Sequence, residues 1–322
     1  MWQEISIREI QGVQIGQAEN AAAGTGVTVF LCGRGAPTGL DVRGGGPASR
    51  ESQLLSPLAS AQAVHAVVLC GGSAFGLDAA GGVMRYLEER GLGFDVGVTK
   101  VPLVCQSCLF DLTVGDARVR PDAAMAYAAC EAAEAGNYLD GNHGAGTGAT
   151  VGKCLGMERC MKSGIGSFAV RLGALEVGAV VAVNALGDVY NWRTGERVAG
   201  MRALDGKGLA SSAEALYSRT EAVENRFTGN TTLGVVITNA RFDKARLCKI
   251  AGMAHDGYAR SIRPVHTSAD GDSIYAMSVG DVEADMDVVG ALAADAVSEA
   301  ILRAVYSARS AYGYPAAADL GK

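Results

Sequence analysis

Charged residues, aromatic residues and prolines are all scarce in this chain of 322 residues. Charged residues make up 19% of it, aromatic residues make up 6%, and there are 7 prolines. The formal net charge is −6 and no basic patch is interleaved with aromatics, which argues against nucleic acid as a partner. No apolar run approaches the roughly 18 residues of a membrane-spanning helix. No secretory signal is visible at the start, so we expect a cytoplasmic protein with no membrane partner.

The cysteines follow neither a disulfide framework nor the spacing of a zinc site. The eight cysteines are scattered through apolar or small-residue contexts, which is typical of reduced, buried thiols. Cys105 and Cys108 form one Cys-x-x-Cys pair, and no second pair accompanies it. Asp270 and Asp272 supply too few oxygen ligands for a hard cation. We therefore predict no metal and no cofactor.

Apolar residues and glycine, in contrast, are abundant. Hydrophobic residues make up 49% of the chain and there are 44 glycines, enough for a sizeable core with many tight turns. No proline-rich or serine-rich linker, repeat or low-complexity tract interrupts the sequence. We therefore expect one domain over residues 1–322.

The apolar patterns predict strands and helices in mixed order. Strands are expected at 25–32, 65–70, 231–239 and 273–279, a hairpin at 176–184 with 188–192, and helices at 74–90, 121–135, 242–262 and 286–306. Gly91 is expected to terminate the first of these helices. Paired strands with long helices between and after them favour a layered α+β protein in which helices cover paired sheets.

Two of the three glycine clusters invite familiar interpretations that fail on spacing. The segment 71–76 lies between a strand and a helix, where backbone N–H groups could hold an anion, but Phe75 stands where a nucleophile elbow needs glycine. The segment 144–153 ends in Gly-Lys, yet Thr147 and Cys154 break the phosphate-loop pattern. Gly44–Gly46 is interpreted as a flexible turn.

The junction of Asn230 and Thr231 is the most informative feature. Gly229-Asn230-Thr231-Thr232 passes directly into the β-branched run Leu233-Gly234-Val235-Val236-Ile237. If the Asn230–Thr231 bond were cut, Thr231 would carry a free α-amine beside its own hydroxyl and serve as both base and nucleophile. The alternative is an ordinary turn that enters a core strand.

Other polar residues allow two interpretations each. Lys153 follows a run of small and apolar residues, so its ammonium could be partly desolvated, or it could be a surface lysine that closes a loop. Asp270 and Asp272 lie on a turn before a strand, where they could orient a nucleophile or simply be solvated. The four histidines show no shared spacing, and each is interpreted as a packed or exposed side chain rather than a ligand.

Several segments, taken in order, resemble one family over nearly the whole chain. The chain is similar to the self-processing peptidases of the L-aminopeptidase/D-esterase (DmpA-type) family, which includes β-aminopeptidases and the endo-type nylon-oligomer hydrolase. The matching segments are GGSAFGL (71–77), VPLV (101–104), FDL (110–112), GNHGAGTG (141–148), VNALG (183–187), GNTT (229–232), and PVHT (264–267) with DGD (270–272).

The resemblance implies a fold, a cleavage site and an assembly. The fold is a four-layer αββα sandwich like that of N-terminal-nucleophile hydrolases. Autocleavage after Asn230 yields an α chain of residues 1–230 and a β chain of residues 231–322, which remain associated. A homo-oligomer, a tetramer or larger, is also implied.

The resemblance also assigns catalytic roles by position. Thr231 matches the nucleophile, Lys153 and Asn184 match an active-site lysine and asparagine, and Asp270 and Asp272 match an acidic pair. Lys153 is expected to lower the pKa of the α-amine, the aspartates to orient it, and Asn184 to donate to the developing oxyanion.

Phe110 stands where better-studied members carry a tyrosine, so it departs from the family pattern. Phe110, Gly72 and Ser73 are candidate substrate or oxyanion contacts.

We therefore expect a self-processing N-terminal-threonine hydrolase that cleaves amide bonds in small peptides or ω-amino-acid oligomers. Two alternatives remain open. One is an acyltransferase of the ornithine acetyltransferase type, which shares the architecture and a threonine nucleophile. The other is a binding scaffold that never cleaves itself.

Overall fold

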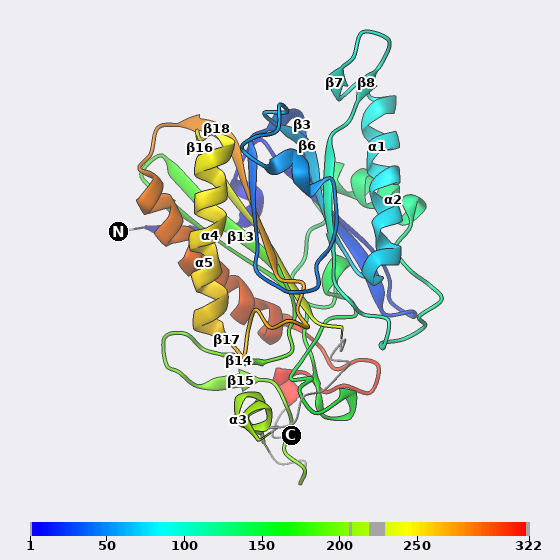
Figure 1. Cartoon of the computed structure of the whole chain (residues 1–322), viewed down its shortest axis with the longest axis vertical. Coiled ribbons are helices and arrows are strands. Elements are labelled where there is room, and N and C mark those ends of the chain that lie inside the picture. The colour runs from blue at the N-terminus through cyan, green and yellow to red at the C-terminus, as the bar shows by residue number, and fades with distance from the viewer. Residues whose placement is uncertain (1, 206–207, 219–228, 320–322) are drawn as a thin grey trace.

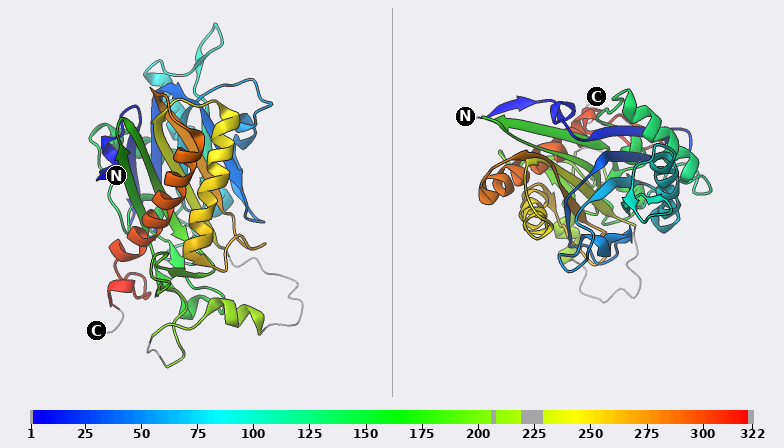
Figure 2. Two further views of the ribbon diagram at one scale, coloured as in Figure 1. Left: turned by 90° about the vertical axis from the view of Figure 1, so that its left-hand side faces the viewer. Right: turned by 90° about the horizontal axis from the view of Figure 1, so that it is seen from above.

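Two β-sheets lie face to face, and a pair of helices covers the outer face of each (Figure 1). The computed structural model describes residues 2–205, 208–218 and 229–319. Seen from above, the two helix pairs lie on opposite sides of the paired sheets (Figure 2). One apolar core fills the space between the sheets, and two others lie between each sheet and its helices. The predicted α+β, four-layer αββα sandwich is thus confirmed.

The larger sheet has six strands. Its order is β1 (Gln3–Ile5), β12 (Ile165–Leu172), β13 (Leu175–Asn184), β16 (Thr231–Ala240), β18 (Ser273–Val282) and β4 (Thr38–Val42). Neighbours are antiparallel except β16 and β18, which run parallel. A parallel pair needs a crossover connection, and α4 (Lys244–Ser261) supplies it. Together with α5 (Met286–Ser307), α4 packs on the outer face of this sheet.

The smaller sheet has five strands, in the order β2 (Gln14–Asn20), β3 (Thr25–Ala36), β6 (Val64–Cys70), β9 (Val104–Cys108) and β5 (Ala48–Arg50). The helices α1 (Ala80–Glu89) and α2 (Ala123–Glu134) cover its outer face. The buried side of α2 is mostly alanine, so the helix lies close to the sheet. A Cβ on Gly16 of β2 would come within 2.1 Å of the Ala129 carbonyl oxygen.

Short elements complete the chain. The strands are β7 (Phe94–Asp95), β8 (Lys100–Val101), β10 (Thr150–Val151), β11 (Met161–Lys162), β14 (Asp188–Tyr190), β15 (Arg197–Ala199) and β17 (Ile262–Arg263). The helix α3 spans Ser212–Tyr217, and 3-10 turns span Ile7–Glu9, Ser52–Leu55, Ser73–Ala79, Gly144–Gly146, Met157–Arg159 and Ala317–Asp319. Among the described residues, no helix is long and apolar enough to cross a bilayer.

Two predicted elements differ from the structure. The segment 74–90 begins as a 3-10 helix and becomes α1 only at Ala80, although Gly91 follows the helix with φ +66° as expected. The hairpin of 176–184 with 188–192 is wrong: β13 pairs with β12 and β16, whereas β14 pairs with β15 and β17. Nearly every β13 side chain is buried, so this strand belongs in the sheet interior.

Side chains along β16 alternate between the two cores. Leu233, Val235 and Ile237 point into the core between the sheets, and Val236 points toward the helices. By the same alternation, Thr231 shares the face of Leu233 and so faces the other sheet. The first residue of this strand therefore lies at one end of the inter-sheet space.

Candidate active site

Thr231 and Asn184 lie opposite each other at this end of the larger sheet. Thr231 begins β16, Asn184 ends β13, and the two are paired residues of the antiparallel ladder. Thr231 is only 4% exposed, and Asn184 is fully buried. Two residues that are 47 positions apart in the sequence thus lie on the same face of the sheet, where β13 ends and β16 begins.

The carbonyl group of Asn230, at the predicted cleavage point, receives two hydrogen bonds. The Thr231 hydroxyl donates to it, and so does the backbone N–H of Gly271, at 3.1 Å. A Cβ on Gly271 would lie 2.6 Å from Thr231 Oγ1, so the acidic loop and the hydroxyl are in close contact. This geometry places a candidate nucleophile and a polarising donor at the same peptide bond.

Lys153 is buried, so its interpretation as a surface lysine is wrong. Its Nζ donates to Asn184 Oδ1 at 2.8 Å, to the Asn184 carbonyl at 3.0 Å and to the Gly229 carbonyl at 3.3 Å. Burial lowers the pKa of the Lys153 ammonium to about 8, although nearby acidic groups, among them Asp270, oppose this effect. One cation therefore joins β13 to the segment that ends at the candidate cleavage point.

The amide of Asn184 is fixed on both sides. Its Oδ1 accepts from Lys153 and from the backbone N–H of Thr150 at 3.0 Å, and its Nδ2 donates to the Phe110 carbonyl at 2.8 Å. In this structure Asn184 thus donates to the Phe110 carbonyl, and the backbone donor to the Asn230 carbonyl is Gly271.

The acidic pair is buried as well, so the interpretation as a solvated turn is wrong. Asp272 Oδ1 accepts the Thr232 backbone N–H at 2.8 Å, and Asp270 Oδ2 accepts the N–H and hydroxyl of Thr267 at 2.9 and 2.5 Å. Burial and the Asp272 charge raise the pKa of Asp270 to about 6. Because β16 and β18 run parallel, the residues that precede both strands meet at one edge of the sheet.

Gly44–Gly46, interpreted from the sequence as a flexible turn, packs against the acidic loop. Gly44 donates its N–H to the Asp272 carbonyl at 3.2 Å, and Gly46 donates to the Asp270 carbonyl at 2.8 Å. A Cβ on Gly44 would lie 2.3 Å from the Asp272 nitrogen. Glycine is needed here because two backbones touch, and the segment braces the acidic loop.

Phe110 reaches the site from the smaller sheet. Its ring lies against Gly229, where an added Cβ would come within 2.0 Å of the ring. Gly72 and Ser73 bind the residues on either side of Phe110. Gly72 donates its N–H to Asp111 Oδ1 at 2.7 Å, and Ser73 donates its N–H to the Leu109 carbonyl at 2.9 Å. The three candidates are therefore linked to the site through the chain around Phe110.

Sequence reasoning missed three contributors. Gly271 acts through its backbone N–H, for which the only sequence signal is a glycine between two acidic residues. Asp111 is buried, accepts from Thr25 Oγ1 at 2.7 Å, and has its pKa raised by burial to about 6. His266 bonds to Asp272, a contact for which histidine spacing alone carries no signal.

No residue set in the described chain resembles a metal centre: within 2–205, 208–218 and 229–319, no three His, Cys, Asp or Glu side chains are grouped to hold an ion. All eight cysteines are free, and seven of them are buried.

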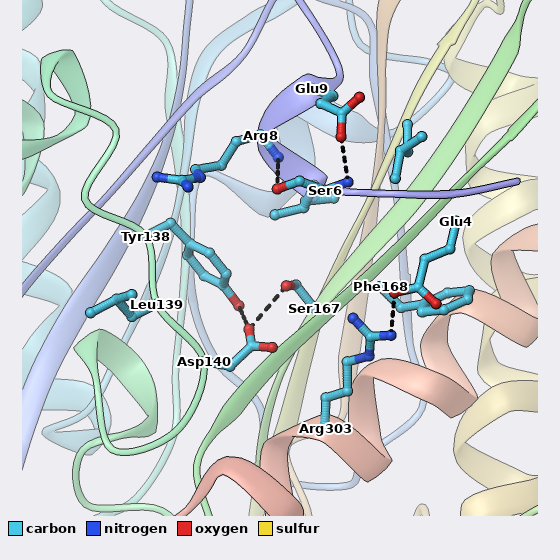
Figure 3. A pocket seen from close by; sticks show the side chains of 12 residues that line it. Glu4, Ser6, Arg8, Glu9, Tyr138, Leu139, Asp140, Ser167, Phe168 and Arg303 are labelled. Atoms are coloured by element: carbon cyan, nitrogen blue, oxygen red, sulfur yellow. Dashed lines mark hydrogen bonds and ion pairs between the residues drawn. The ribbon is translucent and has the colours of Figure 1, made fainter.

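A separate open pocket of about 520 Å³ lies along β1 and β12 (Figure 3). Tyr138 and Ser167 both donate to Asp140 Oδ1 at 2.9 Å, and Arg303 pairs with Glu4 at 2.6 Å. None of the predicted site residues lines this pocket, so it is distinct from the cluster around Thr231.

Comparison with known proteins identifies the family. The model of peptidase family S58 matches residues 6–317. The chain belongs to peptidase family S58. The resemblance found in the sequence is therefore confirmed, and membership places the chain among hydrolases of amide bonds.

The S58 relatives include proteins named as aminopeptidases and as oligomer hydrolases. An uncharacterized aminopeptidase of Mycobacterium leprae is 39% identical, with 96% of this chain and 92% of the relative covered. A 6-aminohexanoate-oligomer endohydrolase of Agromyces is 30% identical, with 92% of this chain and 84% of the relative covered.

Solved structures share the fold of this S58 chain. The L-aminopeptidase D-Ala-esterase/amidase of Ochrobactrum anthropi, described as a variant of the Ntn hydrolase fold, matches with a TM-score of 0.69 at 18% identity, covering 94% of this chain and 86% of that one. A β-aminopeptidase of Burkholderia matches with a TM-score of 0.66 at 20% identity, covering 96% and 88%.

Proposed function

We propose that this S58 peptidase processes itself between Asn230 and Thr231 and then uses Thr231 as an N-terminal nucleophile. The observation that carries the proposal is the contact of the Thr231 hydroxyl with the Asn230 carbonyl, to which Gly271 also donates. Oγ1 would add to the carbonyl carbon and the C–N bond would break, which leaves an ester and a neutral α-amine. Water would then hydrolyse the ester, which leaves residues 1–230 as a separate chain that ends in a new carboxylate.

The same groups can serve a substrate amide. The α-amine, whose ordinary pKa is about 8, would accept the hydroxyl proton as Oγ1 attacks and return it to the leaving amine. The positive charge of Lys153 favours the neutral amine by repulsion. Asp272 anchors the next residue, Thr232, and thereby fixes the strand end that carries the nucleophile. Hydrolysis of the acyl ester would regenerate the enzyme.

Exchanging each of the two adjacent threonines tests the nucleophile. Thr231→Ala should leave an intact chain without amidase activity. Thr232→Val is the matched control, because the Thr232 hydroxyl is buried and has no hydrogen-bond partner among the described residues. This variant should still split into two chains on a denaturing gel. Cleavage at residue 230 in Thr231→Ala would rule out the nucleophile assignment.

The substrate class is proposed from the relatives, whose names include an aminopeptidase and a 6-aminohexanoate-oligomer endohydrolase. We propose that small peptides or ω-amino-acid oligomers are cleaved. A panel of α-, β- and ω-aminoacyl amides, assayed with and without an added amine acceptor, measures this directly. Product transfer to the amine in place of water would favour the acyltransferase alternative.

We also propose a homo-oligomer, a tetramer or larger, on the family resemblance alone. Light scattering of the processed protein measures its mass, and a mass equal to one α and one β chain would contradict this proposal.

A further inference from the structure

His266 makes two hydrogen bonds to one oxygen of the acidic pair. Its backbone N–H lies 3.1 Å from Asp272 Oδ2, and its ring nitrogen Nδ1 lies 2.9 Å from the same atom. The other oxygen, Oδ1, accepts the backbone N–H of Thr232 at 2.8 Å. The Asp272 carboxylate therefore connects His266 to the residue that follows the candidate nucleophile.

The imidazole of His266 packs against two aromatic side chains of α4. The ring of His255, fully buried on that helix, lies 4.8 Å from the His266 ring at 73°, and the ring of Tyr258 lies 5.9 Å away. His255 is itself tied to β4, since its Nε2 lies 3.1 Å from the Asp41 carbonyl. The aromatic packing leaves the His266 ring little freedom to turn away from Asp272.

The backbone of His266 is also unusual. Its φ is +56°, in the left-handed region that few residues other than glycine, asparagine and aspartate adopt readily. This conformation lets its own N–H and its own Nδ1 meet the same carboxylate oxygen.

We propose that His266 is a positioning residue that acts on Thr231 through Asp272. With two hydrogen bonds to Oδ2, His266 keeps Oδ1 of Asp272 directed at the Thr232 N–H. The Asp272 carboxylate thereby fixes the start of β16, which carries the Thr231 hydroxyl and the α-amine that cleavage would release. This inference rests on the proposed function of Thr231. A displacement of about 1 Å at such a centre can cost about a hundredfold in rate.

Two amide substitutions separate positioning from simple packing. The side-chain amide of His266→Asn can occupy the place of Nδ1, and asparagine accepts a positive φ. The longer side chain of His266→Gln places its amide near Nε2, an atom that has no hydrogen-bond partner among the described residues. We expect His266→Gln to lower kcat at least tenfold with KM little changed, and His266→Asn to restore most of that loss. Self-cleavage should slow in the same order.

His143→Asn is the matched control. His143 also pairs with a carboxylate through Nδ1, at 3.0 Å from Glu19, but it lies outside the cluster around Thr231. Its substitution should leave kcat within about twofold of the parent value. Equal losses in His266→Asn and His266→Gln, or no loss in His266→Gln, would overturn the proposal.

Nitrogen chemical shifts give a second readout that does not depend on variant folding. Donation to Asp272 requires a proton on Nδ1, so the wild-type His266 ring should show a protonated Nδ1 at neutral pH. A neutral ring protonated only at Nε2 would contradict the proposal. A wild-type chain that never cleaves, by contrast, would contradict the function of Thr231 and not the tautomer of His266.

Discussion

Lys153 and Asp270 are two charged residues that the protein buries beside the same threonine. Their pKa values shift toward each other: burial raises that of Asp270 to about 6 and lowers that of Lys153 to about 8. The two groups are charged at the same time only between these values, since Asp270 is protonated below about 6 and Lys153 is deprotonated above about 8. Such a narrow window is typical of groups that take part in acid–base chemistry.

The pH dependence of the processed enzyme should follow this window. We expect kcat/KM to rise as the pH passes about 6, where Asp270 becomes ionised, and to fall as it passes about 8, where Lys153 loses the charge with which it binds Asn184. The α-amine titrates in the same range, so each limb belongs to the cluster rather than to one residue. A pH–rate profile measures it, and activity that still rises beyond pH 9.5 would be incompatible with a role for the Lys153 charge.

Gly271→Ala tests the contact between the acidic loop and the Thr231 hydroxyl. The new methyl group would lie 2.6 Å from Thr231 Oγ1 and 3.1 Å from the Gly46 carbonyl oxygen, so the hydroxyl or the loop must shift and their contact must change. Gly271 has no positive φ, and the backbone therefore accepts alanine. We expect a folded chain whose self-cleavage is slowed at least tenfold, followed by intact mass over time. Wild-type processing in this variant would show that the contact between the loop and the hydroxyl does not matter.

At this scale the sequence revealed the Asn230–Thr231 junction, because a small-residue turn and a β-branched strand are local patterns. The sequence did not decide whether Lys153, Asp270 and Asp272 are functional groups of a site or ordinary surface residues. Burial is the property that separates these alternatives, and it depends on segments far away in the chain.

The parallel pairing of β16 and β18 is the element that assembles the site. It brings the start of both strands to one edge, with Leu233 opposite Ser273, so Thr231 and the acidic loop become neighbours. The antiparallel pairing with β13 adds Asn184 from the other side. Strand runs such as 25–32 and 65–70 were predictable from composition, but partner choice was not, and the mistaken hairpin after Asn184 shows the difference. Strands that follow each other in the sequence often pair in a sheet, but they need not do so.

Gly44→Ala probes the brace on the acidic loop. The added Cβ would lie 2.3 Å from the Asp272 nitrogen, and backbone atoms cannot yield as a side chain can. We expect the free energy of unfolding to fall by about 1–3 kcal/mol, as for other overpacked sites, and self-cleavage to become slower.

Gly81→Ala is the control for this substitution. Gly81 lies in α1, where an added Cβ would meet nothing within 4 Å, so alanine should stabilise the protein by about 0.5–1 kcal/mol. Thermal unfolding of both variants gives the comparison. Equal melting temperatures for Gly44→Ala and the parent would argue against the brace.

The whole molecule should stay together after a cut before β16. This strand lies in the interior of the larger sheet, between β13 from the first segment and β18 from the second, and α4 and α5 pack over them. Breaking one peptide bond removes none of these contacts. The two chains should therefore co-elute in size-exclusion chromatography and separate only in denaturant. Dissociation in native buffer would contradict this expectation.

The architecture was predictable to different depths. The order of strands and helices in the sequence was enough for a layered α+β protein, because each apolar face needs a partner layer. The four-layer αββα arrangement came from the family resemblance. Residue patterns alone do not show which sheet a strand joins.

The pairing of β16 has one more consequence, for the choice between two identical side chains. Thr231 and Thr232 have the same chemistry, but side chains alternate along a strand, and only Thr231 faces the space between the sheets. A register slip of one residue would exchange them and direct the wrong hydroxyl inward. Neighbours on both sides of β16 hold the register, so strand alignment decides which of the two hydroxyls can serve as the proposed nucleophile. An insertion or deletion of one residue within β16 should therefore be far more damaging than a substitution at Thr232.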